Sequence, residues 1–430
     1  MVERTKQQSA RLPAPLRLFA ILIIVLTMLS WAFAYFCWLR GMPYPYSWPY
    51  YGHAFGTDFS SFQDRFQYFH SIQFFQFKGP VFLYAAPLAV CYHILFAAWG
   101  NRSSALPAFE IFGICVACVA ALVFYRALRQ HGTTAKNATL FCLISVLFSY
   151  PLYFDLQRGN VEIIVWTFTL AAFWAFRSDR LGISAILIGF AIALKWYPVV
   201  LLGLFFYPRR YRYIAIAIFT AVGVTIFSDL WLGPTIKIAF QETLQGAQTF
   251  IQLYALHYGD VGYDHSFFSV FKLLIYPLRP DLAANLNRYV LLAAVSATAL
   301  YFLRIRKLPV INQISILLIL SITLPPVSFD YTLLHLYICW AIFVIYLIDA
   351  QRAGYSVPFG RLIMGLYAFA LAPHGYVIFA ERRFCGQLRW IGLAALLYIF
   401  LKQPFPEVQS AAPLTASKLQ LTPTLEGSNR

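Results

Sequence analysis

Long continuous apolar runs recur along nearly the whole chain, beginning at residues 16–38. An α-helix needs about 20 apolar residues to cross a bilayer, and unbroken runs favour helices over the alternating strands of a barrel. The pattern therefore predicts an all-α, polytopic membrane protein with about 12 transmembrane helices. We place them at residues 16–38, 106–126, 138–155, 161–176, 181–195, 198–208, 212–232, 287–303, 310–326, 333–350, 362–379 and 388–402.

The apolar segment Pro80–Trp99 does not fit this alternation of spans and loops. Pro87 interrupts it, and a full crossing here would place the basic stretch Arg126–Lys136 outside the cell. Lys and Arg are enriched in cytoplasmic loops. We therefore predict an interfacial or partly inserted helix that belongs to the first of two outer loops, residues 40–79 and 233–286.

The chain is predicted to form one domain. Residues 1–402 make up the multi-pass region, and residues 403–430, rich in Pro, Ser, Thr and Leu without helical periodicity, are predicted to be a disordered cytoplasmic tail. The first apolar run lacks a small-residue cleavage site, so we expect a permanent first helix. No internal repeat indicates an inverted-repeat transporter.

Composition and charge exclude a soluble protein. The chain is 60% hydrophobic and 12% charged, whereas soluble domains carry about 25% charged residues. The net charge of +16 comes from short basic clusters between the apolar runs, a pattern typical of cytoplasmic loops and not of a nucleic-acid interface. This distribution predicts a cell (inner) membrane protein with both termini in the cytoplasm. Arg382, Arg383 and Arg389 are the exception, because they fall outside.

Cysteine spacing and nucleotide motifs point to no cofactor. Cys115 and Cys118 form a C-x-x-C pair, but they lie in an apolar run, where thiols pack as small hydrophobic groups. The chain has no H-E-x-x-H, no carboxylate cluster at metal-ligand spacing, no Walker A loop and no G-x-G-x-x-G. We therefore predict no metal, no cofactor and no use of cytoplasmic nucleotides.

The unusual polar residues gather at the predicted outer ends of the spans. A charged group at membrane depth costs about 2.5–3.5 kcal/mol on insertion scales, so such residues are functional candidates. They include Asp58, the run 155–162, Lys195, the pair Asp264–His265, Asp330 and His335. This asymmetry predicts an active site on the outer face.

Asp58 is the candidate general base. It lies in Gly56–Ser60, just beyond the first helix and flanked by aromatic residues, where a carboxylate is able to accept a proton from a substrate hydroxyl. The alternative is a loop aspartate that caps its own backbone. The sequence leaves both interpretations open.

Two cations are candidates for binding a phosphate. Arg158 precedes Gly159 in a short loop, and its planar fork suits phosphate oxygens, although it could instead pair with Glu162 one helical turn away. Lys195 precedes Trp196 at the predicted tip of a helical hairpin, well placed to meet a lipid phosphate. Its alternative role is a snorkelling anchor.

Three segments near these cations resemble glycosyltransferase family 87. They are Gln157–Asn160, the more specific Gly189–Pro198, and the basic Arg209–Arg212. The likeness extends to Asp58, Asp264–Ser266 and Pro325–Tyr331, and covers roughly residues 17–350. Many relatives have Gly-Gln-Val-Asn where this chain has residues 158–162, which bears on the sugar or acceptor and not on the class.

The resemblance implies a C-type membrane glycosyltransferase that uses a polyprenyl-phosphate sugar, with mannosyltransferases as the characterised examples. It implies inverting, metal-independent transfer of a hexose such as mannose to a glycolipid or glycan acceptor on the outer face. Asp58 would act as the general base, and Arg158 and Lys195 would bind the donor phosphate. Weaker candidates for substrate binding are Asn160, Glu162, His265, Asp330 and His335.

Two other classes remain as alternatives. A polymerase or ligase of lipid-linked glycans would also have about a dozen spans and basic outer loops. A lipid-linked sugar transporter or flippase would need polar groups near the bilayer midplane and broken helices in paired halves. The charges of this chain lie at one boundary instead, which disfavours the transporter.

Overall fold

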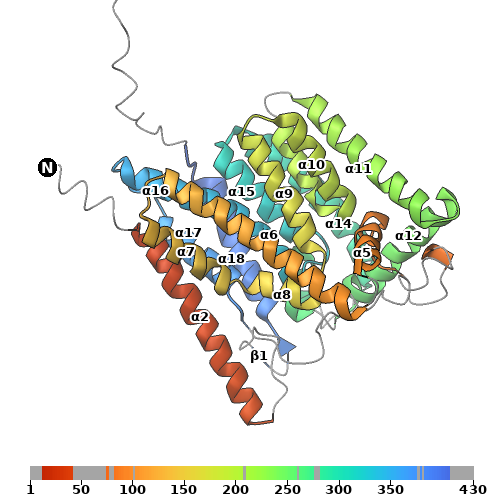
Figure 1. The fold of residues 1–430 in the computed structure, drawn as a ribbon, viewed down its shortest axis with the longest axis horizontal. Coiled ribbons are helices and arrows are strands. Elements are labelled where there is room, and N and C mark those ends of the chain that lie inside the picture. Colours follow the sequence, from red (N-terminus) through yellow and green to blue (C-terminus); the bar gives the residue numbers. More distant parts are fainter. Residues whose placement is uncertain are drawn as a thin grey trace, which may run out of the picture.

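The computed structural model is almost wholly helical (Figure 1). It describes residues 12–41, 74–76, 82–99, 102–206, 210–258, 261–275, 281–374, 378–379 and 382–406. The α-helices are α2 (Ala14–Leu39), α5 (Ala86–Trp99), α6 (Arg102–Gln130), α7 (Ala135–Leu147), α8 (Tyr150–Arg158), α9 (Glu162–Arg177), α10 (Leu181–Leu194), α11 (Tyr211–Leu232), α12 (Ile236–Phe250), α13 (Phe267–Ile275), α14 (Leu282–Leu303), α15 (Val310–Thr323), α16 (Leu336–Arg352), α17 (Gly360–Leu371) and α18 (Cys385–Lys402).

Shorter elements join these helices. Most are 3₁₀ turns: η1 (Phe74–Gln76), η2 (Tyr197–Phe205), η4 (Val261–Tyr263), η6 (Ile305–Lys307) and η7 (Asp330–His335), with a π-helical turn, η3 (Ile251–Ala255), after α12. Strands β1 (Ile378–Phe379) and β2 (Arg382–Arg383) pair antiparallel as a two-residue ladder. The all-α prediction is therefore confirmed, with this ladder as a minor addition.

Six helical segments within the described residues are long and apolar enough to cross a membrane. They are Ala14–Leu39, Leu106–Gln130, Tyr211–Leu232, Leu282–Lys307, Asp330–Arg352 and Cys385–Lys402. The pair α7 and α8, bent by 45°, would form a seventh. The chain is thus a multi-pass membrane protein, while the number of twelve spans stays a prediction.

Several predicted spans are divided or shortened. Residues 138–155 form two helices because Ser149 caps the start of α8 and Pro151 follows it. The described part of the predicted span 198–208 belongs to the 3₁₀ helix η2 (Tyr197–Phe205), whose nine residues rise about 18 Å and cannot cross a hydrocarbon core of about 30 Å alone. The predicted span 362–379 ends early, because α17 stops at Leu371 and Pro373 follows.

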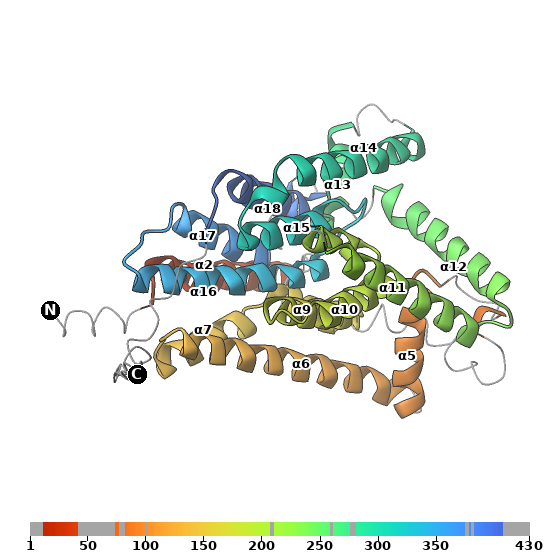
Figure 2. The same ribbon diagram turned by 90° about the horizontal axis from the view of Figure 1, so that it is seen from above.

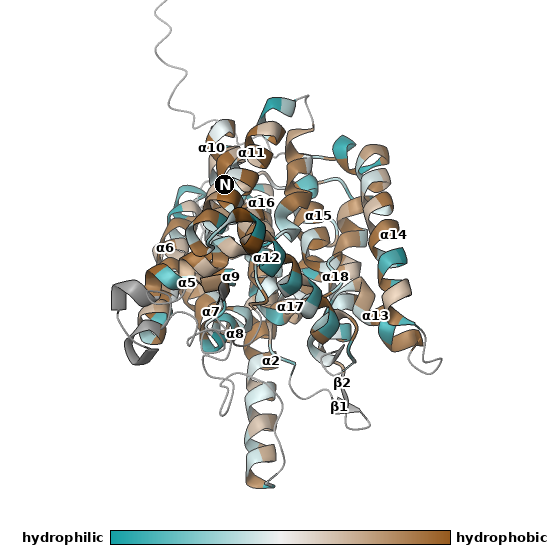
Figure 3. Ribbon diagram, turned by 90° about the vertical axis from the view of Figure 1, so that its right-hand side faces the viewer, coloured by the Kyte–Doolittle hydropathy of each residue, from teal (hydrophilic) through white to brown (hydrophobic). Residues whose placement is uncertain are grey.

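The most buried helix lies in the middle of the bundle and the apolar faces lie outside. Every residue of α15 from Ile311 to Thr323 is buried. By contrast, α11 and α14 expose large apolar side chains, such as Phe219 at 76% and Leu291 at 65%. Figure 3 marks the apolar residues along the helices in brown, those of α14 among them. Such a surface suits lipid and not water.

The start of the predicted tail packs against the bundle. Asn312 of α15 donates to the carbonyls of Phe400 and Gln403 at 2.7 Å each, and its Oδ1 accepts the backbone N–H of Phe405 at 2.8 Å. Phe405 is fully buried. Residues 403–406 are therefore ordered, contrary to the prediction for the tail, and residues 407–430 lie outside the described residues.

Helices α9, α10 and α11 pack closely and bring distant residues together. Only a short turn joins α9 to α10, so the start of α9 and the end of α10 lie at the same end of the pair. Gly189 permits the contact of α10 with α11, because a Cβ there would lie 2.6 Å from the carbonyl oxygen of Ala217. Small residues at such interfaces let helix backbones approach.

Helix α5, within the segment predicted to be interfacial, is oriented differently from the long helices. It follows the short segment 82–85 and stands crosswise to α6, joining that helix at its start (Figure 2). A short apolar helix perpendicular to spanning helices is the geometry expected of an interfacial element.

Loops predicted to lie on the cytoplasmic side contact one another. The contacts are His131 with Asp349 at 2.6 Å, Asp179 with Arg210 at 3.9 Å, and Arg304 with the carbonyl of Leu401 at 2.9 Å. Segments predicted to lie outside meet in the same way at the opposite ends of these helices, and there they form the candidate site.

Candidate active site

A buried carboxylate, Glu162, lies at the centre of a group of polar side chains that we call the Glu162 cluster. Lys195 Nζ donates to Glu162 Oε2 at 2.6 Å, and the Tyr197 hydroxyl donates to Oε1. His335 Nε2 lies 2.8 Å from both Glu162 Oε1 and the Tyr197 oxygen. A carboxylate only accepts hydrogen bonds, so the contact with His335 requires the proton on Nε2. Asn160 completes the cluster.

The local backbone explains why these side chains meet. Gly159 has φ of +65° and ends α8, a left-handed conformation that glycine adopts without strain. Asn160 Oδ1 then accepts the backbone N–H of Glu162 at 3.0 Å and Lys195 Nζ at 3.1 Å. Lys195 itself leaves the helical conformation at the end of α10, with φ of −142°. The short turn between α9 and α10 thus places Glu162 opposite Lys195.

Aromatic rings surround the Lys195 ammonium. Its nitrogen lies 4.6 Å from the centre of the Tyr331 ring and 6.0 Å from that of Tyr84. Only 13% of the Lys195 side chain is exposed, and that of Glu162 is fully buried. The cation is therefore held by Glu162 and Asn160 and lies against two aromatic rings, with a small part of its side chain exposed.

A second group, the Asp330 cluster, lies beside the first. Arg389 Nη1 donates to Asp330 Oδ1 at 2.5 Å, and the Tyr150 hydroxyl donates to Oδ2 at 2.7 Å. His265 Nδ1 lies 3.7 Å from Asp330 Oδ1. The guanidinium of Arg389 also stacks 4.7 Å from the Tyr150 ring centre. All four side chains are buried.

The 3₁₀ helix η7 joins the two clusters. It begins with Asp330, whose carboxylate pairs with Arg389, and ends with His335, which contacts Glu162. Tyr331, next to Asp330, supplies the ring beneath Lys195. Six residues of backbone therefore fix both clusters relative to each other.

Asp264 ties the second outer loop to this region. Its Oδ1 accepts the backbone N–H groups of Ser266 and Ser328 at 2.9 Å each, and its Oδ2 lies 3.9 Å from Lys272 Nζ. Burial raises the pKa of Asp264, and the Lys272 ammonium and the two N–H groups oppose that rise. A Cβ at Gly386 would lie 2.6 Å from the Asp264 carbonyl, so α18 packs directly on this loop.

Arg158 lies at the edge of the site. Its guanidinium carbon is 5.6 Å from the centre of the Phe154 ring, which in turn stacks on Tyr331 at 6.2 Å. Arg158 and Lys195 therefore contact two aromatic rings that stack on each other. The alternative pairing of Arg158 with Glu162 one turn away is wrong, because the helix breaks at Gly159 and the Glu162 carboxylate contacts other side chains.

The structure brings most of the predicted site residues together. Asn160, Glu162, Lys195 and His335 form one cluster, while His265 and Asp330 belong to the other. Asp58 lies outside the described residues. Among the residues that the structure describes, no three His, Cys, Asp or Glu side chains are grouped so as to hold a metal ion.

Four residues of the site were not singled out from the sequence: Tyr150, Tyr197, Tyr331 and Arg389. The sequence does indicate Arg389, because it is a basic residue that falls on the predicted outer side, where few are expected. Asp330, if buried, also requires a cationic partner. Tyr197 and Tyr331 lie in the segments that resemble the family, whereas Tyr150 is one of 28 tyrosines with nothing to distinguish it.

The Arg389–Asp330 pair predicts a measurable coupling. Removing one partner of a buried ion pair leaves an uncompensated charge and typically costs about 3–5 kcal/mol. We expect Arg389→Met to lower the thermal stability of the protein in detergent strongly. Asp330→Asn combined with Arg389→Met should cost clearly less than the sum of the two single changes. Additive effects in this double-mutant cycle would show that the pair contributes no coupling.

A family model for glycosyltransferase family 87 matches residues 80–324, more than half of the chain. The matched region contains Arg158, Asn160, Glu162, Lys195 and His265, but ends before Asp330. No solved structure matches the chain. The match confirms the resemblance, over a shorter range than residues 17–350. The chain belongs to glycosyltransferase family 87.

Proposed function

We propose that the protein transfers a hexose, such as mannose, from a polyprenyl phosphate to a glycolipid or glycan acceptor. Membership of the family makes it a glycosyltransferase. The observation that carries the choice of donor is the Lys195 ammonium, which is fixed by Glu162 and Asn160 at the end of an apolar helix. A fixed cation at membrane depth suits a lipid-linked phosphate.

The outer face of the cell membrane is the proposed location of the reaction. Loops with excess positive charge are retained in the cytoplasm, and the segments that carry them contact one another at one end of the bundle. Both clusters lie where the predicted outer segments meet. The proposed orientation, with both termini in the cytoplasm, follows from these two observations.

Lys195 retains capacity to bind a phosphate oxygen. Its ammonium has three N–H donors, and among the described residues Glu162 and Asn160 accept from it. A third donor remains for a ligand that enters through the small exposed part of the side chain. Glu162 balances the buried cation before the donor binds, which reduces the energy of burying it.

The proposed reaction is a direct displacement. The acceptor oxygen attacks the anomeric carbon, its proton passes to Asp58, and the bond from that carbon to the phosphate oxygen breaks with its electron pair on the phosphate. Lys195 and Arg158 stabilise the charge that the leaving phosphate develops. The polyprenyl phosphate is stable as an anion, so no acid must protonate it. Attack opposite the phosphate inverts the anomeric configuration, and we expect no metal to be required.

A groove of about 310 Å³ offers a place for the lipid part of this donor. It lies between α6, α7, α9 and α16, and Ala117, Ala120 and Ala121 leave room along α6. Its lining includes Trp166 and Leu334, each close in sequence to a residue of the Glu162 cluster. An isoprenoid chain has no polar groups and would lie against these side chains without loss of hydrogen bonds.

Transfer in proteoliposomes tests the proposed function. The purified protein would be given a panel of radiolabelled polyprenyl-phosphate sugars and a lipid extract as the acceptor. We expect label to pass from at least one member of the panel to the extract, and none to pass from nucleotide sugars. Transfer from a nucleotide sugar alone would contradict the proposal.

Lys195 should be required for use of the donor. Because Lys195→Ala alone leaves Glu162 buried without its cation, the change should be made together with Glu162→Gln. Loss of one group that stabilises developing charge typically costs about 10²–10³-fold in rate. We expect a loss of that order in the double variant, and only partial recovery in Lys195→Arg, because a planar fork does not replace a point charge in a shaped site.

Lys237→Ala provides the control for this change. Lys237 is an exposed lysine on α12, and no contact places it in either cluster. It should keep the rate and melting temperature of the unchanged protein. Normal transfer by a folded Lys195→Ala and Glu162→Gln double variant would contradict donor binding by Lys195. Its role would then be that of a membrane anchor.

Asp58 should be the general base. Asp58→Asn keeps the shape but removes the base, and general-base catalysis typically contributes about 10²–10⁴-fold, so turnover should fall by that order while donor binding persists. Asp58→Glu displaces the carboxylate by about one methylene, and misplacement of this size costs on the order of 10²-fold. A loop-capping aspartate predicts the reverse result: a lower melting temperature with normal activity per folded molecule. That result would redirect attention to Asp64, in the same predicted outer loop, or to Asp330.

A further inference from the structure

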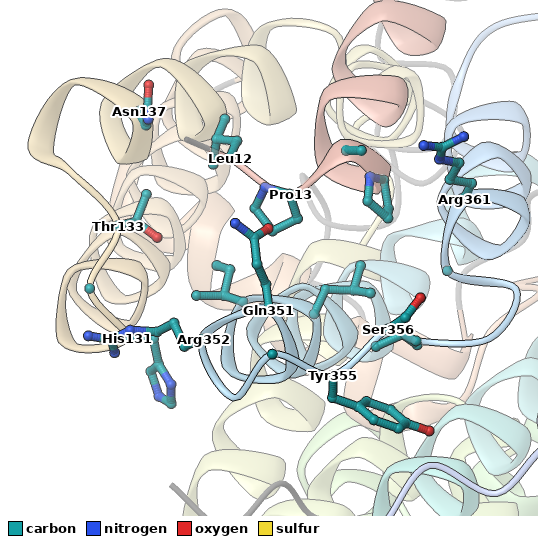
Figure 4. A pocket seen from close by; sticks show the side chains of 18 of the residues that line it. Leu12, Pro13, His131, Thr133, Asn137, Gln351, Arg352, Tyr355, Ser356 and Arg361 are labelled. Carbon is teal, nitrogen blue, oxygen red and sulfur yellow. The ribbon is translucent and has the colours of Figure 1, made fainter. Parts of the chain in front are cut away.

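A second cavity lies at the end of α16 remote from the Glu162 cluster. Its volume is about 1030 Å³, and it is bounded by the start of α2, the turn between α6 and α7, and the turn between α16 and α17 (Figure 4). His335 immediately precedes α16, whereas Arg352 ends it and lines the cavity. Seventeen helical residues rise about 25 Å, so this cavity is separate from the candidate active site.

The lining of this cavity is basic. Arg352, Arg361 and His131 contribute to it, and none of the described residues that line it is acidic. Arg352 and Arg361 stand on different sides, with Pro13 and Gln351 between them in Figure 4. The side chain of His131 is paired outside this set, with Asp349. Two arginines therefore line one cavity, and the nearby acid Asp349 is engaged by His131.

Backbone dipoles add to this positive potential. Helices α2, α7 and α17 all begin at the cavity, and none has an acidic residue in its first turn. The start of a helix carries roughly half a positive charge. The positive potential at the starts of these three helices adds to that of the two arginine side chains. The arginines remain the principal features of the site.

Local backbone geometry makes room for one arginine. Gly132 has φ of +76°, and a Cβ on it would lie 2.5 Å from Arg352 Nη2. Glycine adopts this left-handed conformation without strain, and any side chain here would require the Arg352 guanidinium to move. On the other side, Phe359 is held at φ of +56°, which is uncommon for an aromatic residue, and 57% of it is exposed. Leu362, one turn further, is 51% exposed.

We infer that this cavity binds the headgroup of an anionic phospholipid. Arg352 and Arg361 both line the cavity, and the planar guanidinium fork is well suited to the oxygens of a phosphodiester. The exposed Phe359 and Leu362 beside the cavity match the acyl region next to such a headgroup and would gain nothing from a free phosphate ion. In the proposed orientation the lipid belongs to the cytoplasmic leaflet, where anionic lipids meet basic segments.

A lipid bound here would stabilise the bundle. The cavity is lined by the beginning of α2, by the turn between α6 and α7 and by the turn between α16 and α17, so one headgroup would bridge segments far apart in the sequence. Any ligand that binds only the folded state raises the melting temperature. The inference does not depend on the sugar donor or on the catalytic residues.

The test uses the full-length protein, with native mass spectrometry and thermal unfolding in nanodiscs. Phosphatidylcholine nanodiscs with and without phosphatidylglycerol would be compared for the unchanged protein, Arg352→Gln with Arg361→Gln, and the control Arg306→Gln. Arg306 is an exposed arginine that stacks on Phe302 outside the cavity. Soluble inorganic phosphate serves as the second probe.

We expect phosphatidylglycerol, but not inorganic phosphate, to remain bound and to raise the melting temperature. Loss of two charged contacts should weaken its retention at least about tenfold in the double variant, and the control should behave as the unchanged protein does. Equal retention by the double variant would overturn the site. Equal stabilisation by inorganic phosphate, or by phosphatidylcholine alone, would overturn the assignment to an anionic lipid. Because the lipids are first compared on the unchanged protein, a double variant that fails to fold does not remove the test.

Discussion

The arrangement of the candidate site depends on one requirement: a carboxylate and an ammonium buried at membrane depth must lie together. Glu162 and Lys195 are separated by a helical hairpin, and their contact at 2.6 Å fixes how the ends of α9 and α10 face each other. Breaking such a pair leaves a buried charge uncompensated, which costs far more than an exposed pair contributes. The conformations of Gly159, Asn160 and Lys195 are those that bring this contact about.

The buried carboxylate of Asp330 likewise requires a cation beside it, and η7 connects the Asp330–Arg389 pair with the Glu162–Lys195 pair. Because Asp330 and His335 are the first and last residues of one 3₁₀ helix, the pair with Arg389 indirectly sets the position of His335 beside Glu162. Helix α18 thus takes part in shaping a site to which it contributes a single side chain. The C-terminal region therefore affects the geometry of the candidate site, although the family match ends at residue 324.

Features that depend on the character of individual residues could be predicted from the sequence. Apolar runs predict helices, and charges at their ends predict the group of Asn160, Glu162, Lys195 and His335. Pairing depends on tertiary structure, so the partner of Lys195 and the place of Arg389 could not be derived. Helix lengths failed for a related reason: a run of apolar residues does not distinguish an α-helix from the 3₁₀ helix η2, or one span from the bent pair α7 and α8.

The net charge of +16 conceals two different uses of positive side chains. Near the predicted outer face, Arg389 is buried and the Lys195 side chain is only 13% exposed, and each has a carboxylate at hydrogen-bonding distance. Both are therefore held in fixed positions with little freedom to follow a ligand. At the other end of α16, Arg352 and Arg361 are exposed to an open cavity whose described lining holds no acid. Exposed cations attract anions of varied shape but hold none precisely in place, whereas buried and paired cations are already oriented before a ligand arrives. The difference in burial, and not the number of charges, is therefore the basis for proposing catalysis at one end and lipid binding at the other.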